Sequence, residues 1–169
     1  MTNSVIHKGR LIELHKEKVS LREGGHTYFD VVKHPGGAVI IAINDCNEIC
    51  LLKQWRHAID EHIWELPAGC LETDEAPIKT AARELEEEAG VVAKNWRDLG
   101  VIVPSPGFSN EKLYIFEAKG IAPGSQNLDD AEQLEVHWVP VNEVMAMVDR
   151  DEISDAKTLC ALLKAKVWK

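Results

Sequence analysis

Three glutamates with the spacing of helical neighbours lie in the middle of the chain, in the run Arg83-Glu84-Leu85-Glu86-Glu87-Glu88. Residues three and four apart share one face of a helix, so the carboxylates of Glu84, Glu87 and Glu88 can converge. On an exposed helix their mutual repulsion costs roughly 0.2 to 0.5 kcal/mol per pair. Mg²⁺ and Mn²⁺ prefer carboxylate oxygens and would offset that cost. The run fits a divalent-cation site, but taken alone it favours the alternative, a solvated acidic face on which Arg83 pairs with Glu87, because charge runs on helices are usually solvated.

The residues around these acids predict the helix that positions them. Apolar residues recur at helical spacing from near Glu75, which predicts a helix with one face on a core: Ile78, Ala81, Ala82, Leu85 and Ala89. We expect the acids to lie at the rim of this apolar stripe. Asp74 is the predicted N-cap with Pro77 in the first turn, and Gly90 suits the position that closes the helix.

The full pattern of this region is Gly-x5-Glu-x7-Arg-Glu-Leu-x-Glu-Glu-x-Gly-Val, from Gly69 to Val91. It resembles the Nudix box at every defined position. The resemblance implies a loop, helix and loop that hold Mg²⁺ or Mn²⁺, roughly two or three ions in each site, against the diphosphate of a nucleoside diphosphate derivative that is hydrolysed. It also implies metal ligands, namely the backbone carbonyl of Ala68 and the side chains of Glu84, Glu87 or Glu88. Structural roles within the box are implied for Gly69, Glu75, Arg83 and Gly90.

Four segments outside the box resemble the ADP-ribose pyrophosphatase subfamily: Gln54-Trp55-Arg56, Glu65-Leu66-Pro67-Ala68-Gly69, Ser105-Pro106-Gly107 and Asp155-Ala156-Lys157-Thr158. This resemblance implies hydrolysis of ADP-ribose to AMP and ribose 5-phosphate. It implies substrate contacts from Trp55, Arg56, Glu65, Ser105, Pro106 and Gly107. Trp55 would stack on the adenine and Arg56 would contact phosphate or ribose. The alternatives are plain packing for Trp55 and an ordinary Pro-Gly turn at Pro106.

An acidic loop between Leu128 and Gln133 precedes a late predicted strand. The resemblance implies a further acid in this place, for which Glu132 is the first choice and Asp130 the second. Divalent ions would neutralise the diphosphate oxygens and lower the pKa of the attacking water, and an acid of the loop would accept its proton. We therefore take Glu132, Asp130 and Glu87 as candidate catalytic residues, with the division between base and metal ligand left open.

Composition excludes several other classes of protein. The formal net charge of −9 and the pI of about 5.2 argue against a general nucleic-acid binder, which needs a basic face. The first twenty residues mix charged and apolar side chains, which predicts neither a signal peptide nor a membrane anchor, and hence a cytoplasmic protein. Cys46, Cys50, Cys70 and Cys160 lack zinc-site spacing and are expected to be reduced thiols.

Hydrophobic patterns predict a mixed α/β/α sandwich, the Nudix fold, over residues 35–169, with an N-terminal β extension over residues 1–34. In the extension, Arg10–Leu21 and Thr27–Val32 form a hairpin around Gly24-Gly25. Ala38–Ile43 is the central strand, buried on both faces. Further predicted strands are Ile49–Arg56, Gly100–Val103, Lys112–Glu117 and Glu135–Val139. Helices are predicted over Asn142–Val148 and Ser154–Val167, the latter with a buried stripe of Ala156, Leu159, Cys160, Leu163 and Val167.

The predicted hairpin has a further consequence, because exposed strands invite pairing with another chain. We expect a homodimer with a small nucleoside diphosphate substrate and neither nucleic acid nor membrane as a partner. Other substrates stay open: a different nucleotide sugar such as GDP-mannose or ADP-glucose, or a dinucleotide. A non-catalytic ligand sensor of the same fold is the other alternative, although such proteins typically lose the box carboxylates that this chain keeps.

Overall fold

The computed structural model describes residues 4–128 and 132–167. In chain order, its strands and helices are β1 (Ser4–Lys8), β2 (Glu13–Ser20), β3 (His26–Lys33), β4 (Gly37–Ala42), β5 (Glu48–Arg56), β6 (Glu61–Glu65), β7 (Ala68–Cys70), α1 (Pro77–Ala89), β8 (Val91–Ile102), β9 (Leu113–Pro123), β10 (Leu134–Pro140), α2 (Val141–Asp149) and α3 (Ala156–Ala165).

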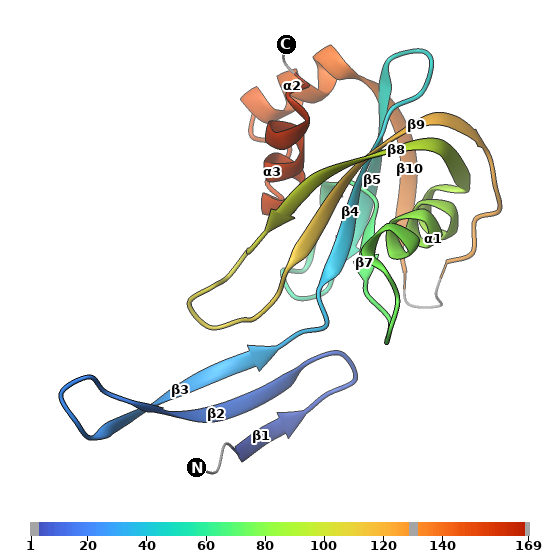
Figure 1. Ribbon diagram of the computed structural model, residues 1–169. Helices are drawn as coiled ribbons and strands as arrows, with labels where there is room; N and C mark the ends of the chain where they lie inside the picture. Colours follow the sequence, from blue (N-terminus) through green and yellow to red (C-terminus); the bar gives the residue numbers. More distant parts are fainter. Residues whose placement is uncertain (1–3, 129–131, 168–169) are drawn as a thin grey trace.

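The strands β1, β2 and β3 form an antiparallel sheet, here called the N-terminal sheet (Ser4–Lys33). Gly24 and Gly25 make the β2–β3 turn with φ angles of 89° and 82°, which glycine adopts without steric cost. The predicted hairpin is present, and β1 adds a third strand that the sequence reading missed. This sheet projects from the rest of the fold, and the chain passes from one to the other where β3 leads into β4 (Figure 1).

The strand β4 is the centre of the remaining fold, and every one of its residues is buried. It pairs in parallel with β9 and antiparallel with β7, within a mixed sheet of order β7-β4-β9-β8. A second, antiparallel sheet has the order β10-β5-β6. The prediction of a central strand buried on both faces is confirmed.

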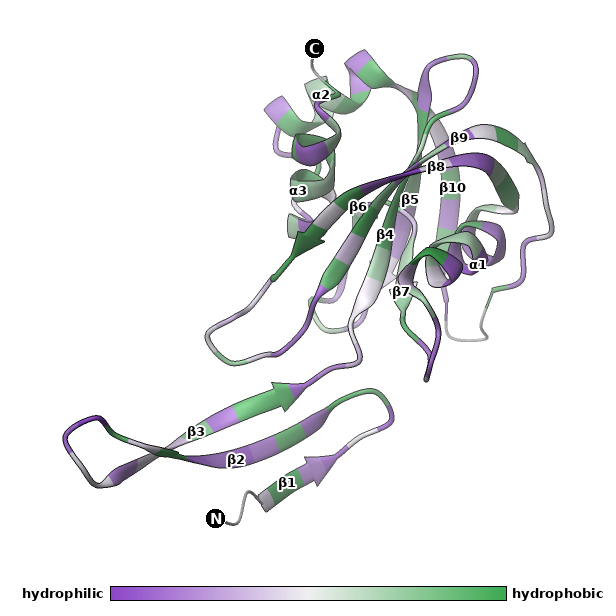
Figure 2. Ribbon diagram, in the orientation of Figure 1, coloured by the Kyte–Doolittle hydropathy of each residue, from purple (hydrophilic) through white to green (hydrophobic). Residues whose placement is uncertain are grey.

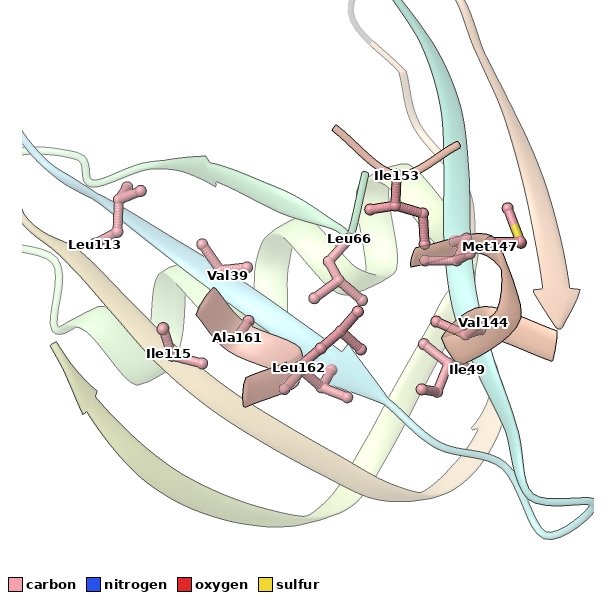
Figure 3. Close-up of a cluster of buried hydrophobic side chains, with 12 residues drawn as sticks. Val39, Ile49, Leu66, Leu113, Ile115, Val144, Met147, Ile153, Ala161 and Leu162 are labelled. Carbon is pink, nitrogen blue, oxygen red and sulfur yellow. The ribbon is translucent and has the colours of Figure 1, made fainter. Parts of the chain in front are cut away.

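Helices cover both sides of the mixed sheet, with α1 on one side and α2 and α3 on the other (Figure 1). Under α2 and α3 lies a cluster of buried apolar side chains (Figure 3) that includes Val39, Leu66, Ile115 and Leu162. Burial of each such aliphatic side chain contributes roughly 1.5 to 3 kcal/mol. The predicted α/β/α sandwich with a mixed sheet is confirmed.

Several local predictions need correction. The helix α1 begins at Pro77 after Ala76, whereas Asp74 has φ 62° and lies in the preceding turn, so the prediction of Asp74 as N-cap was wrong. Aspartate tolerates the left-handed conformation that this turn requires. Gly90 does close α1, with φ 66° and its N–H donating to the Glu86 carbonyl at 2.9 Å.

The terminal helix α3 is rotated from the predicted orientation. Its buried residues are Thr158, Ala161 and Leu162, while Ala156 and Leu163 are exposed. The prediction failed because the polar Thr158 is fully buried in place of an apolar residue. The strand β8 is also much longer than predicted. It pairs with β9 along its length, and its exposed polar residues interrupt the apolar pattern that would predict a strand.

None of the helices among the described residues is long and apolar enough to cross a membrane. All four cysteines are free.

Candidate active site

A pocket of about 720 Å³ opens where β7 and the residues after it, the helix α1 and the end of β5 meet. It gathers residues that are far apart in the sequence and that the sequence analysis had singled out, namely Arg56, Ala68, Glu84, Glu87, Glu88 and Glu132. Asp130, the other candidate in the acidic loop, lies outside the described residues.

Two of the acids on α1 are deeply buried. Glu84 is 8% exposed and Glu88 is 2% exposed, so both lie inside the packed face of the helix and not at its rim as expected. Oε2 of Glu88 accepts a hydrogen bond from the Ala68 N–H at 2.8 Å. Burial, followed by the nearby charges of Glu84 and Glu132, nevertheless holds the pKa of Glu88 well above its usual value. Burial likewise raises the pKa of Glu84.

Arg83 connects the box acids to one another. Its Nη1 donates to Oε1 of Glu84 at 2.7 Å and to Oε2 of Glu87 at 2.9 Å. Its Nε and Nη2 each donate to Glu75 at 3.2 Å, and Nη2 also donates to the Cys70 carbonyl at 3.2 Å. These contacts fit the structural role expected of Arg83, and the Arg83–Glu87 pair of the solvated-face alternative is present as well.

Gly69 allows the backbone of β7 to lie against Glu84. A Cβ atom added at position 69 would come within 1.9 Å of the Glu84 carboxyl carbon. No side chain fits into that distance, so a glycine is required for Glu84 to occupy this position. This is a steric reason for the first residue of the box.

The segment after β9 is fixed to the C-terminal end of α1, where carbonyl groups lack partners within the helix. The Gly124 N–H donates to the Gly90 carbonyl at 2.8 Å, and the Asn127 N–H donates to the Glu87 carbonyl at 2.9 Å. Nε2 of Gln126 donates to the Glu88 carbonyl at 2.8 Å. These bonds lead the chain to the pocket, which Asn127 and then Glu132 line. Sequence reasoning missed Asn127, since no pattern marks a polar residue in such a loop.

On β5, Gln54 and Arg56 line the pocket, but Trp55 between them does not. Successive side chains of a strand point to opposite faces, and the Trp55 ring packs edge-on against His62 at 5.0 Å. Glu65 is 1% exposed and accepts hydrogen bonds from Arg56. The structure therefore brings Arg56 to the pocket and places Glu65 behind it.

The loop with Ser105, Pro106 and Gly107 also lies outside the pocket lining. It is hydrogen-bonded to the end of β3, where the Val32 N–H donates to the Phe108 carbonyl at 2.7 Å. The turn between β1 and β2 does reach the pocket, through Arg10 and Leu11. The sequence analysis missed both, because nothing local indicates that a turn of the extension folds back over the box.

The donor set fits a hard divalent cation, since it consists of carboxylates and a backbone carbonyl. Ala68, Glu84, Glu87 and Glu88 are the candidate ligands. In the conformation described here, Arg83 holds Glu84 and Glu87, and the Ala68 N–H holds Glu88. Across residues 4–128 and 132–167, no three acidic, histidine or cysteine side chains are already gathered closely enough to hold an ion. Binding would therefore require some of these hydrogen bonds to exchange for metal contacts.

The fold and the acid-lined pocket together define a family. Residues 33–162 match the NUDIX domain model, and the chain belongs to this family of hydrolases. Divalent metal ions are generally used by its members.

Among curated proteins, the chain is 37% identical to the ADP-ribose pyrophosphatase of Bacillus subtilis (strain 168) and 34% identical to the methanol dehydrogenase activator of Bacillus methanolicus. Each alignment covers 93% of this chain and 86% of the relative. A crystal structure of an ADP compounds hydrolase superposes with a TM-score of 0.86 at 19% identity, covering 99% of this chain and 91% of that one. At this low identity, the structural similarity shows the fold alone.

Proposed function

We propose that this Nudix hydrolase cleaves the diphosphate bond of ADP-ribose to give AMP and ribose 5-phosphate, with Mg²⁺ or Mn²⁺ as cofactor. The observation that carries the proposal is one pocket that is lined both by Glu84, Glu87, Glu88 and Glu132 and by Arg56. Acids alone would repel a diphosphate, and a cation beside them provides a second contact for its oxygens. The similarity to an ADP-ribose pyrophosphatase over most of both chains supports the choice of substrate.

When bound, the divalent ions supply charge neutralisation for the diphosphate and a lower pKa for the attacking water. Glu84, Glu87, Glu88 and the Ala68 carbonyl would hold them, roughly two or three in each site. Arg83 keeps the box acids in place through charge-assisted hydrogen bonds. Glu132 accepts the proton of the water, with Glu87 as the other described candidate and Asp130 as a further one. Arg56 binds a phosphate or ribose oxygen.

We also propose that the protein acts as a homodimer through the N-terminal sheet. Hydrophobic residues occur on all three strands of this sheet (Figure 2). Its strands expose large apolar side chains, each at least 41% exposed, namely Val5, Ile6, Val19, Tyr28 and Phe29. Exposed apolar residues gathered on one element are typical of an interaction site. The loop with Ser105, Pro106 and Gly107 is attached to the same sheet, so a second chain docked there would lie beside it. Contacts of Trp55 and of this loop with substrate remain part of the proposal.

A nucleotide sugar such as GDP-mannose or ADP-glucose, or a dinucleotide, is the alternative substrate. The chain is 34% identical to the methanol dehydrogenase activator, close to its 37% identity to the ADP-ribose pyrophosphatase. Sequence identity alone therefore does not select the substrate. The test is a panel of these compounds with Mg²⁺, in which phosphate is measured after coupling to a phosphatase. We expect kcat/KM for ADP-ribose to exceed that of every other compound by at least about tenfold, roughly 1.4 kcal/mol of transition-state binding. A higher value for GDP-mannose would overturn the assignment.

A further inference from the structure

The helix α3 is tied to the wall of the active-site pocket by buried polar contacts. Asp155 caps the helix and accepts hydrogen bonds from the Thr158 N–H at 2.9 Å and from the Thr158 hydroxyl at 2.6 Å. The same hydroxyl oxygen accepts a hydrogen bond from the Leu66 N–H at 2.9 Å. Thr158 is fully buried, so these bonds fix the start of α3 against the chain that leads into β7.

Lys157 extends this connection toward the pocket. Its Nζ donates to Oε2 of Glu65 and lies 3.1 Å from Oδ2 of Asp155, and its side chain is 16% exposed. Glu65 in turn accepts both hydrogen bonds of a forked contact from Arg56, from Nε to Oε1 and from Nη2 to Oε2, each 2.6 Å long. A line of alternating charges therefore runs from α3 through Glu65 to the pocket.

Arg56 has the geometry of a residue held in place for binding. Its side chain is 40% exposed, whereas Glu65 behind it is almost fully buried. The fork fixes the plane of the guanidinium and leaves its other N–H donors for groups in the pocket. Burial alone would raise the pKa of Glu65, but the hydrogen bonds from Arg56 and the charge of Lys157 lower it below its usual value. The two cations therefore favour the ionised form of Glu65 behind Arg56.

The charge of Lys157 has a consequence for substrate binding. With it, the acids Glu65 and Asp155 are balanced by the bases Arg56 and Lys157. Without it, the cluster carries a net negative charge next to a site for an anionic substrate, and the charge of Arg56 is largely taken up by Glu65. A buried carboxylate beside an unbalanced anion disfavours a further anion nearby.

We propose that Lys157 is a positioning residue for substrate binding, which acts through Glu65 to keep the guanidinium of Arg56 oriented and available to the anionic part of the substrate. The inference rests on the binding role proposed above for Arg56. Lys157 belongs to no part of the Nudix box and does not line the pocket. Lys157 therefore affects substrate affinity through Glu65 and Arg56, although it does not line the pocket itself.

The test compares Lys157→Met, which removes the charge, with Lys157→Arg, which keeps it. We expect Lys157→Met to raise KM for ADP-ribose about tenfold while kcat changes less than about threefold, because loss of a charged partner weakens substrate and transition state alike. Lys157→Arg should stay within about threefold of wild-type KM, since an arginine still supplies the charge to Glu65.

Thr158→Val is the matched control, because it breaks the same attachment of α3 without changing any charge at Glu65. It should lower Tm and leave KM near the wild-type value. An unchanged KM in Lys157→Met, an equal rise in Lys157→Arg, or an equal rise in Thr158→Val would each overturn the proposal. If the wild type does not hydrolyse ADP-ribose, the proposed function fails separately, and the same variants are then measured with the panel compound that the wild type hydrolyses best.

Discussion

At the scale of single residues, the site contains acids whose burial reduces the stability of the fold. Glu88 is almost fully buried beside Glu84 and Glu132, and its pKa lies well above the usual value because burial disfavours its charge. A hydrogen bond from the Ala68 N–H offsets only part of that cost. Such a group reduces stability at neutral pH, which is typical of residues retained for function.

Replacing Glu88 by glutamine separates its cost to stability from its role in activity. Glutamine keeps the shape and can still accept the Ala68 hydrogen bond, so Glu88→Gln should raise Tm in EDTA by a few degrees, where ~1 kcal/mol corresponds to about 2 to 4 °C in a chain of this size. Its kcat should fall by at least about a hundredfold. Thermal melting and steady-state kinetics measure the two.

Glu87→Gln is the comparison variant, because the side chain of Glu87 is 35% exposed and its replacement relieves little burial. It should also lose at least about a hundredfold in kcat without the rise in Tm. Activity close to wild type in both variants at saturating Mg²⁺ would refute the metal site and favour a solvated acidic face.

The raised pKa of Glu88 also predicts how stability depends on pH. Its folded pKa lies above its unfolded value of about 4.5, so the proton is bound more tightly in the folded state. The corresponding stability is fully present below the unfolded pKa and is lost as pH rises through the folded pKa. In EDTA, the Tm advantage of Glu88→Gln over wild type should therefore be largest above neutral pH and should shrink toward pH 4.5. An advantage that stays constant across that range would contradict the burial argument.

At the scale of elements, the sequence predicted types better than boundaries and faces. The box helix, its closing Gly90 and the central strand follow from local spacing and β-branched content, and the structure has all three. The start of α1 was missed because Asp74 adopts a left-handed conformation in the turn before the helix. The buried face of α3 was missed because Thr158 bonds to the distant Leu66 N–H, which no local pattern reports.

In the site as well, local spacing identified some residues, and others depend on tertiary contacts. The acids of α1 were identifiable from their spacing, while Asn127 and the turn with Arg10 reach the pocket only through the way the chain folds back. Trp55 was expected to face the site from β5, but strand alternation turns it away from the pocket that its neighbours Gln54 and Arg56 line. Lys157 had no sequence signal of its own beyond the segment around it.

The variant Gly69→Ala tests the close approach of β7 to α1. In Gly69→Ala, the new Cβ would meet the Glu84 carboxyl. We expect this overpacking to cost roughly 1 to 3 kcal/mol of unfolding free energy, so that Tm falls, and we expect activity to be lost. Adding Glu84→Ala to the same chain removes the obstructing carboxyl and should restore most of the Tm but none of the activity. Melting curves of the single and double variants measure this, and a double variant no more stable than Gly69→Ala would show that the contact is not the cause.

At the scale of the whole molecule, the N-terminal sheet stands out because it has little core of its own. Most of its residues are exposed or only partly buried, and it is joined to the rest mainly through β3 and the loop after β8. A small isolated sheet of this kind is marginally stable in water unless something packs against it. A second copy of the chain would cover its apolar side chains.

Sedimentation at micromolar concentration should accordingly show a dimer for the wild type. Phe29→Asp places a charge on an exposed apolar position of the N-terminal sheet and should shift the protein to monomer, because burial of an unpaired charge in an interface is unfavourable. Leu163→Asp changes a residue on α3 that is at least as exposed as Phe29 and should leave the dimer intact. A wild type that sediments only as a monomer, or a Phe29→Asp variant that stays dimeric, would remove the N-terminal sheet as the interface.

The most direct test of the account is the reaction itself. Purified protein is incubated with ADP-ribose and Mg²⁺, and the products are separated and identified, with EDTA and the Glu88→Gln variant as parallel samples. We expect AMP and ribose 5-phosphate in equal amounts with Mg²⁺. Release of both products should be slower by at least about a hundredfold in the variant, and essentially no product should form in EDTA. Folded wild-type protein that leaves ADP-ribose intact with Mg²⁺ or Mn²⁺, or that cleaves it equally well in EDTA, would contradict it.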